Sequence, residues 1–197
     1  KEREVLISRT VKLVNNRVPV LVGVTHCATR EAIKMASQAS KLGANAVVVA
    51  PPYYYPLSSI ALKEHFLAIA DKSPIPLFIY NIPQTTKIRL DIELVVALSK
   101  HPMIAGIKDS SGDFSYFQQL ICYAQSSNFL VFQGHEELVA GSLLLGADGI
   151  VPGLGNIFPQ LYLQFVATAK QLDVLACREL QRQVYALLKI YNYGSVY

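Results

Sequence analysis

Short apolar runs alternate with longer helical patterns along this sequence, and this alternation limits the possible folds more than any other feature. The apolar runs are too continuous for half-exposed strands, so they predict a parallel sheet that helices cover. The six predicted strands are 18–24, 46–51, 75–80, 104–108, 129–133 and 149–151. The predicted helices are 2–14, 29–42, 59–71, 91–100, 114–124, 136–145, 159–172 and 174–190.

Two of the predicted helices end in the same way, with Leu-Gly-Ala followed by Asn or Asp and then directly by a strand. Gly43 and Gly146 stand just past these helices, where glycine readily takes the left-handed conformation that stops a helix. The repetition indicates a βα unit used many times. Right-handed crossovers between such units allow an open doubly wound sheet or a barrel. No glycine-rich nucleotide-binding motif follows a strand, which weakens the case for the open sheet.

Polar and aromatic residues gather at the C-terminal ends of the predicted strands, as in the active site of a (βα)8 barrel. They are Thr25, His26, Tyr53, Tyr54, Tyr55, Tyr80, Asn81, Lys108, Asp109, Ser110, Gly134, His135, Glu136 and Asn156. We therefore predict an α/β fold, a TIM barrel. Because a barrel needs eight strands, we expect about two N-terminal βα units to be absent from this sequence. Residues 1–172 would then form strands 3 to 8 of a partial barrel, and 173–197 would begin a C-terminal helical extension.

Composition excludes several classes of function. The net charge of +4 is spread out, without a run of like charges, so we predict no nucleic-acid surface. No apolar stretch reaches the roughly 18 residues that a membrane helix needs. We interpret Cys27, Cys122 and Cys177 as reduced thiols buried in a cytoplasmic protein. The four histidines form no ligand set, so we expect no metal site.

Lys108 is the first candidate for chemistry because it is a charged amine that closes an apolar strand. A desolvated amine becomes a nucleophile toward carbonyl carbon and can form a Schiff base. The alternative is a structural lysine paired with Asp109 or with a neighbouring loop. Tyr80 closes the preceding strand, so its phenol could reach a carbon bound to Lys108 and transfer protons. The alternative for Tyr80 is a core position.

Two further groups lie at strand ends. Tyr53, Tyr54 and Tyr55 cannot all face the same way, so some of them would pack internally or cross a subunit interface, where tyrosine is favoured. His135 and Glu136 would contact a polar substrate or serve only as loop and helix-capping residues.

Several segments, in this order along nearly the whole chain, resemble the dihydrodipicolinate synthase and N-acetylneuraminate lyase family of class I aldolases, which are (βα)8 barrels. The segments are Gly23, Pro51 to Tyr54, Tyr80 to Pro83, Gly106 to Ser111, Gly134 and Gly146 to Gly149.

This resemblance implies roles for individual residues. Lys108 would form an imine with pyruvate, and Tyr80 would transfer the protons. Tyr54 matches a tyrosine that often reaches into the neighbouring subunit's site, which implies a homo-oligomer, a dimer or tetramer. Gly134 and Val151 match positions whose backbone lies against the lysine and substrate. No cofactor is implied.

The sequence also departs from the family pattern. A Gly-Thr-Thr-Gly-Glu loop that binds the pyruvate carboxylate should precede Lys1. Thr85 stands where dihydrodipicolinate synthases commonly have an arginine for the second substrate's carboxylate, although Lys87 could replace it. The segment around Thr85 and the segment 132–136 look more like 2-keto-3-deoxy sugar-acid aldolases. Glu136 matches a carboxylate that sialic acid lyases use on substrate hydroxyls.

The resemblance therefore implies a cofactor-free class I lyase that combines pyruvate with a small aldehyde or 2-oxo acid, or cleaves the product. A 2-keto-3-deoxy sugar acid is the expected product. The alternative enzyme is dihydrodipicolinate synthase, which condenses pyruvate with aspartate semialdehyde. A non-catalytic barrel or sugar-acid sensor is the alternative from another class.

Overall fold

The strands form one parallel sheet that curves into part of a barrel. The computed structural model describes residues 2–123 and 129–194. Within them the sheet has six strands in the order β1-β2-β3-β4-β5-β6, and every neighbouring pair is parallel. They are β1 (Leu21–Gly23), β2 (Ala46–Val49), β3 (Leu77–Asn81), β4 (Ile104–Asp109), β5 (Leu130–Gln133) and β6 (Gly149–Ile150). Because this order never reverses, the sheet winds in one direction as a barrel does, and the prediction of a barrel type is confirmed.

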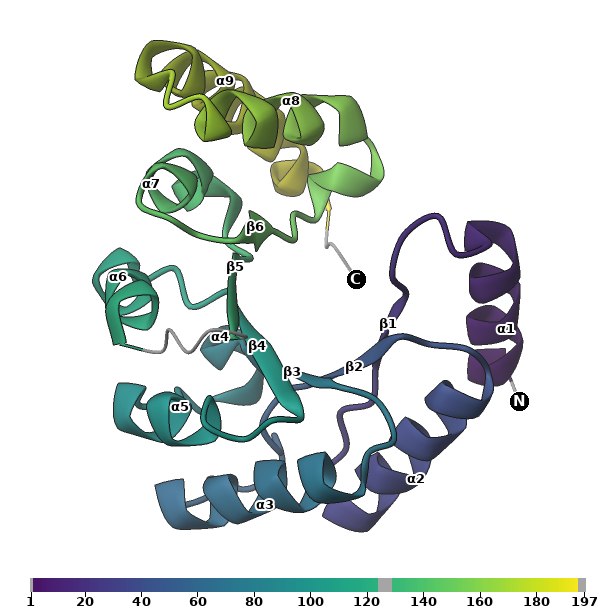
Figure 1. The fold of residues 1–197 in the computed structure, drawn as a ribbon. Helices are drawn as coiled ribbons and strands as arrows, with labels where there is room; N and C mark the ends of the chain where they lie inside the picture. The colour runs from purple at the N-terminus through teal and green to yellow at the C-terminus, as the bar shows by residue number, and fades with distance from the viewer. Residues whose placement is uncertain (1, 124–128, 195–197) are drawn as a thin grey trace.

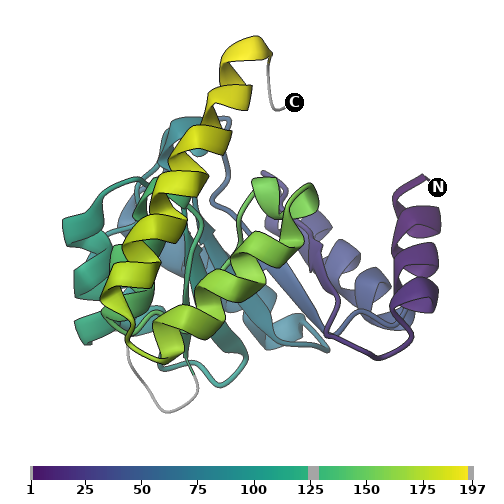
Figure 2. The same ribbon diagram turned by 90° about the horizontal axis from the view of Figure 1, so that it is seen from above.

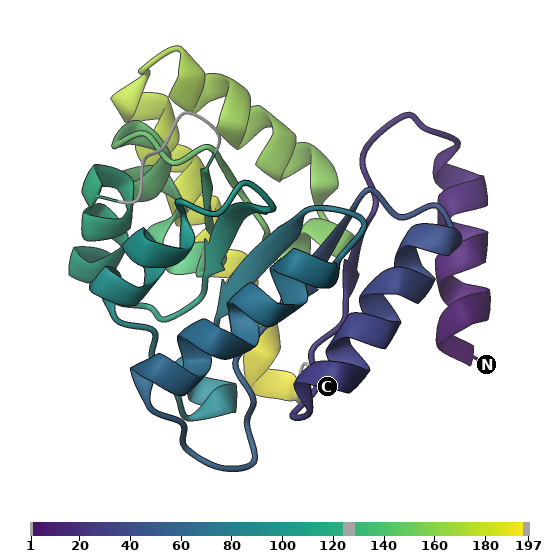
Figure 3. The ribbon, with the colours of Figure 1, turned by 60° about the horizontal axis from the view of Figure 1, so that its bottom comes forward.

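The helices cover the outer face of this curved sheet (Figure 1). They are α1 (Glu2–Val14), α2 (Thr29–Lys41), α3 (Ser59–Lys72), α4 (Pro83–Thr86), α5 (Ile92–Leu98), α6 (Phe114–Tyr123), α7 (Val139–Leu144), α8 (Pro159–Lys170) and α9 (Val174–Leu188). Three 3₁₀ turns are η1 (Glu136–Leu138), η2 (Leu154–Asn156) and η3 (Lys189–Tyr193). Figure 3 shows α2 and α3 side by side outside the sheet, with α1 beyond α2.

The predicted elements differ from the structure mainly at their ends. The first strand is shorter than 18–24 because Val20 N donates to the Asn45 side chain at 2.7 Å, outside the strand ladder. The helix predicted at 136–145 is divided into η1 and α7. The short elements α4, η2 and η3 were not predicted. Residue 124, the predicted end of one helix, lies outside the described residues.

The glycine turns predicted after two helices are confirmed. Gly43 has φ of 91° and Gly146 has φ of 100°, both in the left-handed region that glycine tolerates. Each turn leads into a strand, β2 after Gly43 and β6 after Gly146.

Two apolar clusters hold the fold together. The larger lies between the sheet and α2 to α6, with Phe66, Ile79 and Phe117 fully buried. The smaller joins α7, α8 and α9 through residues such as Phe165, Cys177 and Val184. Figure 2 shows α8 and α9 lying against each other beside the sheet. The predicted boundary at 172/173 falls inside this second cluster, so α9 packs directly on the last βα units.

Two expectations from composition can be compared with the structure. No helix among the described residues is long and apolar enough to cross a membrane. All three cysteines are free, and Cys177 is buried. Cys27 and Cys122 are exposed, so the interpretation of these two thiols as buried was wrong. Cys27 lies in an exposed segment after β1, and Cys122 lies on the solvent side of α6, next to the buried Ile121.

Candidate active site

Lys108 and Tyr80 lie side by side at the C-terminal ends of β4 and β3. The parallel register pairs the two residues, and Lys108 Nζ lies 4.5 Å from the centroid of the Tyr80 ring. Both side chains are half-buried. An ammonium or amine over an aromatic face is an attractive contact. The structure thus brings together the two residues that the sequence selected for chemistry.

These two side chains line a cavity of about 560 Å³ on the inner face of the sheet. Its other lining residues are Arg3, Leu21, Gly23, Thr25, Val48, Phe78, Phe132 and Val151. The lining is mostly apolar, and such surroundings strengthen electrostatic interactions. A carbonyl compound of a few carbon atoms fits this volume, with Lys108 in reach of its carbon.

Asp109 does not pair with Lys108, because successive residues of a strand point to opposite faces. The Asp109 carboxylate is buried and accepts hydrogen bonds from Asn81 Nδ2 at 2.7 Å and from Ser111 Oγ at 2.9 Å. Burial raises the pKa of Asp109, and these hydrogen bonds oppose that rise. No ion pair of Lys108 is found among residues 2–123 and 129–194. The alternative of an ion pair between Lys108 and Asp109 is therefore wrong.

Gly134, at the end of β5, has no Cβ and so leaves room for the Lys108 side chain. A Cβ at position 134 would lie 2.6 Å from Lys108 Cε, 3.1 Å from the Asp109 carbonyl oxygen and closer still to Ser110 Oγ. Gly134 N donates to the Asp109 carbonyl at 2.7 Å, which fixes this approach. The role expected for Gly134, against the lysine and substrate, stays a prediction, and this close approach supports it. Val151 lines the same cavity from the end of β6.

Glu136 turns its carboxylate away from that cavity into a buried cluster. Its Oε1 accepts hydrogen bonds from Leu154 N and the Tyr162 hydroxyl, and its Oε2 accepts one from the Tyr191 hydroxyl. Burial and the bond to Glu136 raise the pKa of Tyr162. A substrate role for Glu136 stays a prediction, and this geometry does not favour it.

Thr85 is exposed on α4, and no guanidinium stands in its place. Lys87 Nζ donates to the Gln84 carbonyl at 2.7 Å. Arg89 pairs with Asp113 at 3.0 Å and lies 4.8 Å from the centroid of the Tyr116 ring. The basic side chains that follow Thr85 are therefore held in other contacts.

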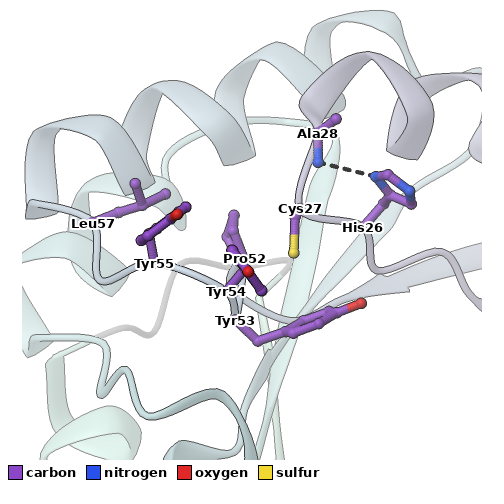
Figure 4. Close-up of a pocket in the computed structure, with 8 residues that line it drawn as sticks. All are labelled: His26, Cys27, Ala28, Pro52, Tyr53, Tyr54, Tyr55 and Leu57. Carbon is purple, nitrogen blue, oxygen red and sulfur yellow. Dashed lines mark hydrogen bonds between the residues drawn. The ribbon is translucent and has the colours of Figure 1, made fainter.

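The three consecutive tyrosines line a second pocket, of about 550 Å³, at the ends of β1 and β2. Figure 4 shows the Tyr53 ring near Cys27 and His26 and the Tyr55 ring near Leu57. His26 Nδ1 accepts a hydrogen bond from Ala28 N at 3.0 Å. Tyr54 is 73% exposed and stacks edge-on against Tyr55. Tyr54 does not line the Lys108 cavity. The structure therefore separates it from the other predicted catalytic residues within one chain.

No group of three or more His, Cys, Asp or Glu side chains that could hold a metal ion occurs in the described part of the chain. Two features of the site were not predicted from the sequence. The Asn81 to Asp109 hydrogen bond could have been inferred from their positions directly after Tyr80 and Lys108. The links from Gln181 and Tyr191 to Glu136 span 45 and 55 residues, and no local pattern signals them.

The model of the dihydrodipicolinate synthetase family matches residues 1–197. The chain belongs to this family. It is 38% identical over 175 residues to a 4-hydroxy-tetrahydrodipicolinate synthase of Acidobacterium capsulatum, covering 88% of this chain and 58% of the relative. It is 34% identical over 159 residues to the synthase of Exiguobacterium sibiricum, covering 81% and 54%. Within the family, this chain thus spans little more than half the length of these curated relatives.

The family fold is also seen in solved structures. The chain superimposes with a TM-score of 0.92 on the chloride-inhibited dihydrodipicolinate synthase of Acinetobacter baumannii, which was solved in complex with pyruvate. The two are 31% identical, and the alignment covers 98% of this chain and 66% of that one. The resemblance to the dihydrodipicolinate synthase and N-acetylneuraminate lyase family is thereby confirmed.

Proposed function

We propose that this protein is a class I lyase in which Lys108 forms a Schiff base with pyruvate. The main support is the pair formed by Lys108 and Tyr80. Lys108 Nζ lies 4.5 Å from the Tyr80 ring centroid, in a largely apolar cavity that admits a small 2-oxo acid. Membership of the dihydrodipicolinate synthetase family supports the same chemistry.

In this proposal the Lys108 amine attacks the C2 carbonyl carbon of pyruvate, and loss of water gives an iminium. The iminium withdraws electrons, so a proton leaves C3 and an enamine forms. The enamine carbon then attacks an aldehyde, and the Tyr80 phenol donates a proton to the new alkoxide. Hydrolysis of the imine regenerates the amine. Cleavage runs through the same steps in reverse.

Aspartate semialdehyde is the first candidate for the aldehyde. The curated relatives are 4-hydroxy-tetrahydrodipicolinate synthases, which supports this acceptor over the sugar-acid product that the sequence motifs favoured. The second candidate is the aldehyde that combines with pyruvate to give a 2-keto-3-deoxy sugar acid. It is favoured by Thr85, because no basic side chain stands there for a second carboxylate.

The two candidates are separated by assaying the same preparation for two reactions: condensation of pyruvate with aspartate semialdehyde, and release of pyruvate from 2-keto-3-deoxygluconate. The first candidate predicts the larger kcat/KM for condensation. Thr85→Arg should raise the preference for condensation further, since it supplies a carboxylate partner, whereas Thr85→Ser is the matched control. A larger kcat/KM for cleavage would contradict the first candidate and support the second.

We also propose that Tyr54 contacts a second copy of the chain in a cytoplasmic homo-oligomer. Its exposed ring, together with exposed Tyr53 and Tyr55, supports such a contact. Measuring the mass of the protein in solution for wild type and Tyr54→Ala tests this. A monomer in both would contradict the proposal.

A further inference from the structure

The carboxylate of Glu136 joins three segments that are distant in sequence. Glu136 is 8% exposed. Its Oε1 accepts from Leu154 N of η2 at 3.0 Å and from Tyr162 of α8, and its Oε2 accepts from Tyr191 of η3 at 3.0 Å. No ion pair of Glu136 is found within the described ranges. Three donors thus replace the water that this buried charge has lost.

The backbone around Glu136 is fixed by α9. Gln181 Nε2 donates to the Glu136 carbonyl at 3.0 Å, while Gln181 Oε1 accepts from Ala140 N at 2.9 Å. The Tyr185 hydroxyl lies 3.4 Å from the Glu137 carbonyl oxygen. The C-terminal helix is therefore hydrogen-bonded to the loop that leaves β5.

This loop begins at Gly134, whose backbone lies against Lys108. A Cβ at 134 would come within 2.6 Å of Lys108 Cε, so a small shift of the loop changes the space for the amine. On its other side, Glu136 holds η2, which follows the cavity residue Val151. Gly153 also lies against this cluster, because a Cβ there would be 2.9 Å from the Tyr191 hydroxyl and 3.5 Å from Glu136 Oε2. The loops after β5 and β6 therefore both contact Glu136, and the first of them also contacts Lys108.

We propose that Glu136 is a positioning residue for Lys108: its carboxylate ties the loops after β5 and β6 to α8 and to η3, which follows the C-terminal helix, and so fixes Gly134 and Val151 around the amine. This inference rests on the proposed Schiff-base function. It gives the C-terminal helix a part in the site although α9 does not line the Lys108 cavity. The substrate contact expected for Glu136 stays a prediction, and the protein donors on both of its oxygens do not favour it.

The proposal is tested with Glu136→Gln, which keeps the size of the side chain but removes the charge and one acceptor. Tyr191→Phe removes one donor, and Tyr193→Phe, at a 90% exposed tyrosine, is the matched control. Amide hydrogen exchange is measured on peptides that contain Gly134 and Leu154. We expect faster exchange in both peptides for Glu136→Gln and Tyr191→Phe, and unchanged exchange for Tyr193→Phe. Unchanged exchange in Glu136→Gln would overturn the proposal whether or not the protein forms an imine.

The link to Lys108 is tested by the fraction of protein that borohydride fixes to pyruvate at increasing pyruvate concentration. We expect the pyruvate concentration for half-maximal fixation to rise about tenfold in folded Glu136→Gln, because displacement by a fraction of an ångström lowers reactivity. Tyr191→Phe should cause part of this rise and should add nothing in the Glu136→Gln background. Unchanged fixation in Glu136→Gln would overturn the link, as would full additivity of the two variants. Absence of fixation in the wild type would instead contradict the Schiff-base function itself.

Discussion

Asn81 Nδ2 donates a 2.7 Å hydrogen bond to Asp109 Oδ1 directly behind the pair formed by Tyr80 and Lys108. The register places Asn81 opposite Asp109, just as it places Tyr80 opposite Lys108. Asn81 is fully buried, and Asp109 is almost fully buried. Because the strands alternate faces, one pair fills the layer under the helices while the other faces the cavity. The buried pair thus fixes the strand ends that carry the proposed chemistry.

Replacing Asn81 by leucine should destabilise the protein. The change leaves the Asp109 carboxylate without its shortest donor and Leu90 N without its 3.3 Å acceptor, Asn81 Oδ1. Loss of partners for buried polar groups costs about 1–3 kcal/mol each, so we expect a decrease of roughly 3 kcal/mol in the free energy of unfolding. Urea denaturation measures this, with Gln160→Leu as the exposed control. Equal stabilities for the two variants would contradict a structural role for the buried pair.

Removing the Tyr80 hydroxyl should separate imine formation from proton transfer. In Tyr80→Phe the ring beside Lys108 remains, so borohydride should still fix pyruvate to the protein. The overall kcat should fall by roughly 100-fold or more, since general acid–base catalysis contributes on that order. Tyr123→Phe, at an exposed position of α6, serves as the control. A Tyr80→Phe variant with wild-type kcat would show that the phenol is not the proton donor.

Adding one methyl group at Gly134 should block the amine. The Cβ of Gly134→Ala would lie 2.6 Å from Lys108 Cε and 3.1 Å from the Asp109 carbonyl oxygen, so the lysine side chain must shift. We expect activity to fall by at least tenfold, because reacting groups must stay within a fraction of an ångström of their geometry. Gly194→Ala is the control, since nothing lies within 4 Å of its Cβ. Similar activities of the two variants would show that the Gly134 contact does not matter.

Acid should destabilise the fold through His65. This ring is 5% exposed, and its Nδ1 lies 2.8 Å from Thr29 Oγ1. Burial lowers the pKa of His65 from 6.5 to about 4. The unfolded chain therefore takes up a proton near pH 6.5, whereas the folded chain does not until about pH 4. The stability due to neutral His65 is complete above pH 6.5 and is lost as the pH falls through this window.

The expected loss is roughly 3 kcal/mol between pH 7 and pH 4, from the difference between the two pKa values. Urea denaturation at several pH values measures it. His65→Gln should show a flatter dependence on pH over this range, since glutamine does not titrate. If the variant loses as much stability as the wild type, other groups are responsible.

Local pattern was sufficient for much of the fold. Continuous apolar runs located the six strands found within residues 2–123 and 129–194, and Gly43 and Gly146 located two helix ends, because these signals act over a few residues. The split of 136–145 into η1 and α7 was missed, since it depends on Glu136 and its distant partners. The exposure of Cys27 was also missed, because composition alone does not show whether a helix covers this thiol.

In the candidate site, too, residues placed by local pattern were predicted, whereas residues placed by distant contacts were not. Lys108 and Tyr80 could be selected because each ends an apolar run, and parallel strands bring such ends together. The placement of Glu136 could not be foreseen, because Tyr191 approaches it only after α8 and α9 have packed. The acceptor aldehyde stays a proposal, because the sequence motifs around Thr85 and the names of the curated relatives point to different substrates.

The proposed Schiff base at Lys108 is best tested by borohydride reduction in the presence of pyruvate. We expect a stable adduct on a single peptide, with the modified residue identified as Lys108 by mass spectrometry. Lys108→Arg should abolish the adduct, while Lys87→Arg, whose amine is bonded to the Gln84 carbonyl, should leave it unchanged. An unmodified wild-type protein, or an adduct at any other lysine, would show that Lys108 does not form the Schiff base.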